Sequence, residues 1–183
     1  MSIESPKSKK PKEPNDVREY VLGKTDAEIA LRSPSEFSDA ANNMAEQAQQ
    51  SIKLVTQQLD HHLFDNPDFA QALVRVANKS RYSQVMILLR DAAPAVREGH
   101  RLIELSQRFS SGIEVRRVSR DFSDRIDEYL IVDDNGMIFR ANHERYRGVA
   151  NYFDRSRLPQ MLSDFKDQWE NGTPEMQFRR LHL

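Results

Sequence analysis

A hairpin signal in the carboxyl-terminal third of the sequence constrains the fold more than any other feature. The step Asp134-Asn135-Gly136 supplies Asn and Gly, which tolerate the positive φ angles that a tight two-residue turn requires. The ranges 128–133 and 137–142 should therefore pair as antiparallel strands. Each carries a short continuous apolar run, which predicts strands inside a sheet covered on both faces.

An amphipathic helix is predicted directly after this hairpin. Large apolar residues recur there at helical spacing, so one stripe of the helix should pack on the sheet. These residues are Leu158, Met161, Leu162, Phe165 and Trp169.

Two further helix starts can be read from cap residues followed by proline. Ser33 and Glu36 have the spacing of a capping box with proline between them, which predicts a helix running to about residue 50. Asn66 followed by proline predicts a second helix that ends near residue 80. A third helix is expected over 96–109, and strands are expected over 28–32, 52–59, 84–90 and 113–118.

This alternation of helices and strands predicts an α/β three-layer sandwich. The sheet is expected to be mixed and mostly parallel, with the antiparallel hairpin as the exception. The run QVMILLR at 84–90 is the most apolar strand candidate and should lie at the sheet centre. Residues 1–16, rich in proline and lysine, are predicted to be a disordered tail, residues 17–172 a single domain, and residues 173–183 a second tail.

Composition excludes several classes of protein. No run approaches the roughly 18 apolar residues of a membrane span, and no apolar core of a secretory signal follows the amino terminus. A cytoplasmic location and no membrane association are therefore expected. The absence of cysteine removes thiol nucleophiles and zinc ribbons. A net charge of −1 predicts no global attraction to nucleic acid, so any basic site must be local.

The order of elements over residues 27–170 resembles one half of a phospholipase D enzyme. In that family the strand before the hairpin carries His, one residue, Lys, four residues and Asp. Two such motifs, from a duplicated chain or a homodimer, build one active site. The resemblance implies that the His would be the nucleophile and the Lys would bind phosphate oxygens.

The residues at the family's motif positions differ from that pattern. Aligning the family Asp with Asp133 places Ile126 at the His position and Glu128 at the Lys position. Shifting the alignment to Asp134 offers no better match. The family's Gly-Ser-any-Asn signature falls on residues 140–143, which read Arg-Ala-Asn-His. The resemblance therefore implies a degenerate, non-catalytic member, similar to uncharacterised bacterial domains found near or fused to Gcn5-related acetyltransferases.

Other catalytic and metal motifs are weak. Asp60-His61-His62 has the sequence of a metal-binding triplet. Adjacent residues on a strand point to opposite faces, so the two histidines could not both bind one ion there. Surface histidines in a loop are therefore the favoured interpretation. No nucleophile elbow or Gly-rich phosphate loop is present. We expect neither a metal nor a cofactor.

A local arginine cluster follows the hairpin, with aromatic residues between the arginines. Arginine beside aromatic rings is typical of phosphate or single-strand binding surfaces. The alternative is a structural set that pairs with Asp124, Asp127 or Glu128. The candidate binding residues are Arg140, Arg145, Tyr146, Arg147, Tyr152 and Arg155.

Three functions fit these observations. The first and favoured one is a non-catalytic binding or regulatory module, homodimeric, that acts on a protein or a phosphate-bearing partner such as nucleic acid. The second is a residual phosphodiesterase with relocated residues such as His143 and Asp133. The third is a structural subunit of an acetyltransferase assembly.

Overall fold

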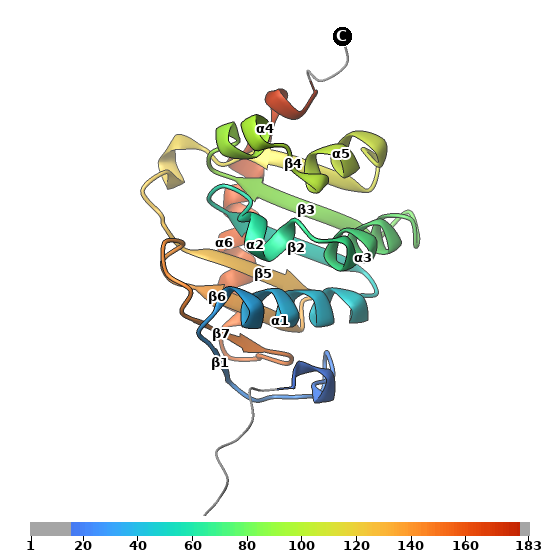
Figure 1. Cartoon of the computed structure of the whole chain (residues 1–183), viewed down its shortest axis with the longest axis vertical. Helices are drawn as coiled ribbons and strands as arrows, with labels where there is room; N and C mark the ends of the chain where they lie inside the picture. Colours follow the sequence, from blue (N-terminus) through green and yellow to red (C-terminus); the bar gives the residue numbers. More distant parts are fainter. Residues whose placement is uncertain (1–15, 180–183) are drawn as a thin grey trace, which may run out of the picture.

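The computed structural model of the chain describes residues 16–179 (Figure 1). The tail expected over 1–16 lies outside the described residues, apart from Asp16. Asp16 caps a short 3-10 helix, Val17–Glu19, because its carboxylate accepts a hydrogen bond from the Arg18 backbone at 3.1 Å. Within the described part of the chain, no helix has the length and apolar character needed to cross a membrane.

One eight-stranded sheet organises the domain, in the order β1-β7-β6-β5-β2-β3-β4-β8. The pairs β2–β3 and β3–β4 are parallel, and the other neighbours are antiparallel. The strands are β1 Ile29–Leu31, β2 Ser51–Thr56, β3 Gln84–Leu89, β4 Ile113–Arg117, β5 Glu128–Val132, β6 Gly136–Arg140, β7 Gly148–Asn151 and β8 Thr173–Pro174. The mixed α/β class is confirmed, but the sheet is less parallel than expected, because β5, β6 and β7 form an antiparallel meander.

Helices cover both faces of the sheet, which makes the expected three layers (Figure 1). One face carries α1 Pro34–Gln47, α2 His61–Phe64, α3 Pro67–Ala77, α4 Ala93–Glu98 and α5 Arg101–Arg108, and the other carries α6 Leu158–Asn171. Two further 3-10 helices span Arg120–Phe122 and Met176–Arg179. Alternate strand residues feed the two apolar cores: Leu54 and Leu130 pack under α1 and α3, whereas Val55 and Ile131 pack with Phe165 of α6.

The two capped helix starts are confirmed. The Ser33 hydroxyl accepts a hydrogen bond from the Glu36 backbone N–H at 3.2 Å, and the Asn66 side chain accepts one from Phe69 at 2.9 Å. The single helix expected over 96–109 is wrong. Gly99 has φ +77° and ends α4, and His100 then caps α5. The chain changes direction there because glycine adopts this φ without steric cost.

The hairpin is confirmed, but its turn lies earlier than expected. Asp133 and Asp134 have φ +52° and +53°, and the Asn135 backbone donates to the Val132 carbonyl at 3.0 Å. Gly136 is instead the first residue of β6. A Cβ there would lie 2.6 Å from Leu22 Cδ1, so the glycine permits close packing rather than a turn conformation.

The expected carboxyl-terminal tail, 173–183, is partly integrated into the domain. Thr173 and Pro174 pair with the end of β4. Phe178 is 3% exposed and belongs to the larger apolar core. The domain therefore extends beyond residue 172. The sequence around Phe178 shows no helical or strand period, so its burial could not be predicted.

Candidate functional site

A groove of about 480 Å³ opens where β2 ends and β5 begins. Its wall comes from the loop after β2, from α2, from the end of α4 and from the ends of the hairpin strands. Glu128, which the sequence resemblance aligns with the lysine of the phospholipase D pattern, lies at its base with Arg140. The lining residues are Gln57, Gln58, Leu59, Asp60, His61, His62, Pro94, Arg97, Glu98, Glu128, Arg140 and His143.

A buried ion pair between Glu128 and Arg140 fills the base of this groove. The two side chains face each other because Glu128 and Arg140 are paired positions on β5 and β6. They are 4% and 2% exposed. The Arg140 Nε donates to Glu128 Oε2 at 3.1 Å, and Nη2 contacts the same oxygen. Hydrogen bonds to a charged partner compensate for burial, so the pair is stable only while both members are present.

The second oxygen of Glu128 is held by the end of β2. Its Oε1 accepts a hydrogen bond from the Thr56 hydroxyl at 2.9 Å and from the Gln57 backbone at 2.6 Å. The Thr56 hydroxyl in turn accepts from the Leu59 backbone at 3.2 Å. This carboxylate therefore has donors on both oxygens and orders the loop that forms one wall of the groove.

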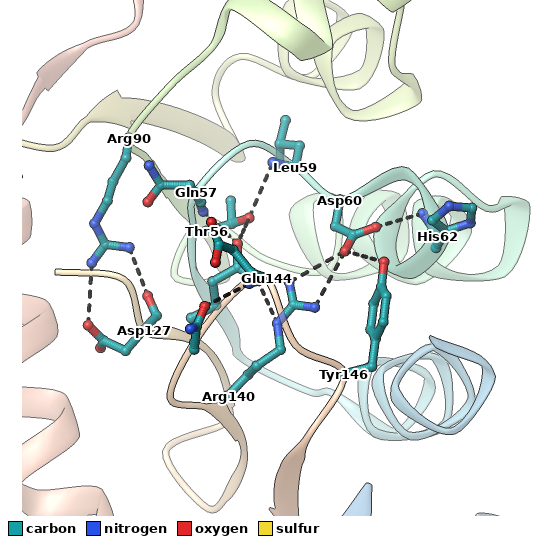
Figure 2. Close-up of polar contacts among 12 residues, drawn as sticks. Thr56, Gln57, Leu59, Asp60, His62, Arg90, Asp127, Arg140, Glu144 and Tyr146 are labelled. Carbon is teal, nitrogen blue, oxygen red and sulfur yellow. Dashed lines mark hydrogen bonds and ion pairs between the residues drawn. The ribbon is translucent and has the colours of Figure 1, made fainter. Parts of the chain in front are cut away.

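Asp60 extends the network toward the surface (Figure 2). Both terminal nitrogens of Arg140 lie 3.4 Å from Asp60 Oδ2, and the Tyr146 hydroxyl donates to that oxygen at 2.9 Å. Burial and this bond to Asp60 raise the pKa of Tyr146. Asp60 Oδ1 caps α2 by accepting from the His62 backbone at 3.0 Å. The triplet at 60–62 therefore begins a short helix rather than lying in the expected loop.

The electrostatics of the groove follow from these contacts. Arg140 has two carboxylate partners and the rings of Phe37 and Tyr146 within 6 Å of its guanidinium carbon, at 5.7 and 5.1 Å. These two carboxylates balance its positive charge inside the protein. The Glu128 carboxylate at the base of the groove would repel a phosphate.

Ile126 and Asp133, which the sequence resemblance aligns with the other two motif positions, lie at opposite ends of β5. Ile126 is 49% exposed, and its carbonyl accepts a hydrogen bond from the His143 backbone at 3.0 Å. Asp133 lies at the opposite end of β5, where its carboxylate accepts hydrogen bonds from the backbones of residues 49–51 at 2.6, 2.7 and 2.9 Å. A five-residue strand is about 17 Å long, so His143 and Asp133 do not form the catalytic pair considered from the sequence.

The arginine cluster is divided by the fold. Arg140 is buried, and Tyr152, also expected at the surface, is fully buried with its hydroxyl 2.8 Å from Asn43 Oδ1. Arg145 and Arg147 are exposed in the loop between β6 and β7, which follows the end of β6 that carries Arg140. Arg155 is exposed too, but follows the other end of β7, close to the hairpin turn, because the Asp154 backbone bonds to the Asn135 carbonyl.

Histidines form a second polar cluster beside the groove. His61 Nδ1 lies 3.1 Å from Asp65 Oδ2, and its ring is 4.9 Å from that of the buried His100. Burial lowers the pKa of His100 to about 4, although the charge of Asp65 opposes this shift. Among residues 16–179, no group of three acidic or histidine side chains is arranged to hold a metal ion.

Sequence reasoning missed the other partners of the Glu128–Arg140 pair. Thr56, which bonds to Glu128, precedes it by 72 residues, and Asp60, which bonds to Arg140, precedes it by 80, so no local pattern connects them. The only available signal was the cross-strand geometry of the hairpin, which places residue 128 opposite residue 140 once the turn is located.

Comparison with known proteins gives a family and a fold. Residues 33–181 match the model of a domain of unknown function (DUF7931). No curated protein matches the sequence.

Solved structures with a similar fold include Nuc from Salmonella typhimurium, a phospholipase D family member, at 21% identity over 81% of this chain and 97% of that chain, with a TM-score of 0.57. NucT from Helicobacter pylori is 14% identical over 81% and 99%, with a TM-score of 0.53. TrmBL2, an archaeal chromatin protein described as showing a novel mode of DNA binding, is 17% identical over 81% of this chain, with a TM-score of 0.60, and the match spans 53% of TrmBL2. The chain has the phospholipase D-like fold and belongs to the DUF7931 family.

Proposed function

We propose that this protein is a non-catalytic phospholipase D-like module that binds a phosphate-bearing partner, namely single-stranded nucleic acid. The observation that carries the proposal is the Glu128–Arg140 pair. Glu128 is the residue that the resemblance aligns with a phosphate-binding lysine, and its pairing with Arg140 supports the loss of phosphate binding at the base of the groove.

The loss of catalysis follows from two positions. Phosphoryl transfer in this family needs a nucleophilic imidazole, and the aliphatic side chain of Ile126 has no lone pair with which to attack phosphorus. Glu128 cannot neutralise the developing negative charge on a phosphoryl group. Its own charge is already balanced by Arg140 at the base of the groove. A substrate phosphate therefore has neither a nucleophile nor a cation at this point.

Binding is assigned to the loop between β6 and β7 rather than to the base of the groove. Arg145 and Arg147 are exposed, and among residues 16–179 neither has a carboxylate within 4.0 Å. Free guanidinium groups bind phosphate in a bidentate manner. The similarity in fold to TrmBL2, whose description includes DNA binding, supports nucleic acid as the partner. A protein-only adaptor is the competing function and would leave these arginines without a phosphate ligand.

Fluorescence anisotropy with short labelled single-stranded DNA and RNA tests the proposal. Binding should be weak and salt-sensitive, because each phosphate contact on a single strand contributes roughly −0.7 to the log–log salt slope. The double variant Arg145→Ala, Arg147→Ala should lower the steepness by about 1.4. Arg155→Ala is the matched control, since this exposed arginine lies at the opposite end of β7. Flat anisotropy at low salt would reject nucleic acid in favour of a protein-only partner.

We also propose that two copies associate through the groove edge, as the resemblance to single-half relatives implies. The half-exposed Ile126 supplies apolar surface there. A symmetric dimer would place the same edge of each copy in contact, which is the usual arrangement of an isologous interface.

A further inference from the structure

Arg32 is a basic residue that lies at the β1–β7 edge, beside the loop between β6 and β7 that carries Arg145 and Arg147. It follows β1, and β1 pairs antiparallel with β7 in a register that sets Leu31 opposite Gly148. Arg32 directly follows Leu31 and Arg147 directly precedes Gly148, so both arginines lie at this end of the β1–β7 pair, one residue outside the strands. A register continued by one residue would set them opposite each other with Cβ atoms about 5 Å apart, where the two guanidinium groups can reach the same ligand. Arg32 is 113 residues from Arg145 in sequence, which is why no local charge pattern reveals it.

Strand alternation, continued one residue beyond the ends of β1 and β7, predicts that Arg32 and Arg147 share a face. Along β1, Ile29 and Leu31 are buried under α1 while Ala30 is exposed, so Arg32 continues the side of Ala30. Ala30 is paired with Val149, which packs with the core under α6, and Arg147 continues the side of Val149. Both arginines therefore belong to the α6 face at the β1 edge of the sheet.

Two guanidinium groups set opposite each other in this way would be unfavourable without a ligand. Like charges directly opposite on neighbouring strands repel and destabilise the pair. Within residues 16–179, Arg32 has no carboxylate within 4.0 Å, and neither has Arg147. The nearest acidic group on the adjoining helix, Glu36, uses its Oε2 to accept a hydrogen bond from the Arg32 backbone at 2.6 Å. Glu144 is the remaining carboxylate of the loop, and it is exposed to solvent.

We propose that Arg32 is a third phosphate-binding residue, and that a single strand of nucleic acid runs along the β1–β7 edge, over Arg32 and Arg147 and on to Arg145. This inference rests on the proposed nucleic-acid function and extends it to a defined path. It also replaces Arg140, which is buried, as the third contact of the surface. The wild-type salt slope is then about −2 rather than about −1.4, because three single-strand phosphates are neutralised instead of two.

The salt dependence of binding to a labelled single strand, measured for four proteins, tests the role of Arg32. The proteins are the wild type, Arg32→Ala, Arg32→Lys and the Arg145→Ala, Arg147→Ala double variant. Arg32→Ala should reduce the steepness of the salt slope by about 0.7, and Arg32→Lys should restore it, since lysine keeps the positive charge. Thermal unfolding supplies a second readout. Removing one member of a repelling pair should leave the melting temperature unchanged or raise it, whereas removing a structural arginine lowers it.

The outcomes separate the inference from the function on which it rests. If the double variant loses salt dependence while Arg32→Ala binds like the wild type, the path along β1 is wrong and the function stands. If Arg32→Ala weakens binding only together with a drop in melting temperature, Arg32 is structural and the inference is wrong. If the wild type does not bind at all, both are rejected.

Discussion

Replacing Arg140 by methionine tests the buried network at the base of the groove. Methionine keeps much of the side-chain length and makes favourable contacts with aromatic rings, so it should pack near the Phe37 and Tyr146 rings that the Arg140 guanidinium faces. The substitution then mainly removes the charge. It leaves Glu128 buried with one of its two oxygens unpaired.

The expected cost can be worked from these contacts. Removing one member of a buried ion pair costs about 3–5 kcal/mol. Glu128 keeps its bonds from Thr56 and the Gln57 backbone, so we expect the lower end, about 3 kcal/mol. For a domain of this size each kcal/mol lowers the melting temperature by about 2–4 °C, which gives a decrease of about 6–12 °C.

Urea and thermal unfolding followed by circular dichroism measure this cost. The double variant Glu128→Gln, Arg140→Met should be less destabilised than the sum of its single variants, because it leaves no unpaired charge. Lys166→Ala is the control, since Lys166 forms an exposed pair with Glu170 and should change stability by less than about 1 kcal/mol. The reasoning is refuted if Arg140→Met costs no more than Lys166→Ala, or if the two groove substitutions are additive.

Three further predictions follow from the structure. Burial lowers the pKa of His100 to about 4, whereas the histidine of the unfolded chain binds a proton near pH 6.5. Because the unfolded state therefore binds more protons between these values, the free energy of unfolding should fall by about 3 kcal/mol as the pH is lowered from 6.5 to 4. His100→Asn, which retains the cap on α5, should remove this loss, and an unchanged pH profile would contradict the assignment. Light scattering should give the mass of a dimer at micromolar concentration; a strictly monomeric mass rejects association through the groove edge. The purified protein should not hydrolyse a chromogenic phosphodiester with or without manganese, and activity abolished by His61→Ala or His143→Ala would instead establish an enzyme.

Local features of the fold could be predicted from the sequence because their causes are local. Ser33 and Asn66 cap helices through bonds to residues three positions away, and these helices begin where expected. The hairpin at 134–136 was located for the same reason. Its turn is built by Asp133 and Asp134, which have positive φ. Gly136 lies in the strand instead, where close packing against Leu22 leaves no room for a Cβ.

Features that depend on distant residues could not be predicted. Gly99 within an otherwise helical pattern gave no indication that His100 would begin a new helix. The direction of each strand depends on its neighbours, so the antiparallel pairing of β5 with β2 was not foreseen. The sequence predicts that the arginine cluster forms one surface. In the fold, Arg140 is buried against Asp60, and Arg155 lies at the opposite end of β7 from Arg145 and Arg147.

A single gel experiment tests the central claim of binding without catalysis most directly. An end-labelled single-stranded oligonucleotide is incubated with the protein at low salt, and each reaction is divided between a native and a denaturing gel. We expect a retarded complex on the native gel that disappears as salt increases and is weakened in the Arg145→Ala, Arg147→Ala variant. The denaturing gel should show the oligonucleotide intact. Cleavage fragments, or the absence of any retarded complex at low salt, would contradict the proposed function.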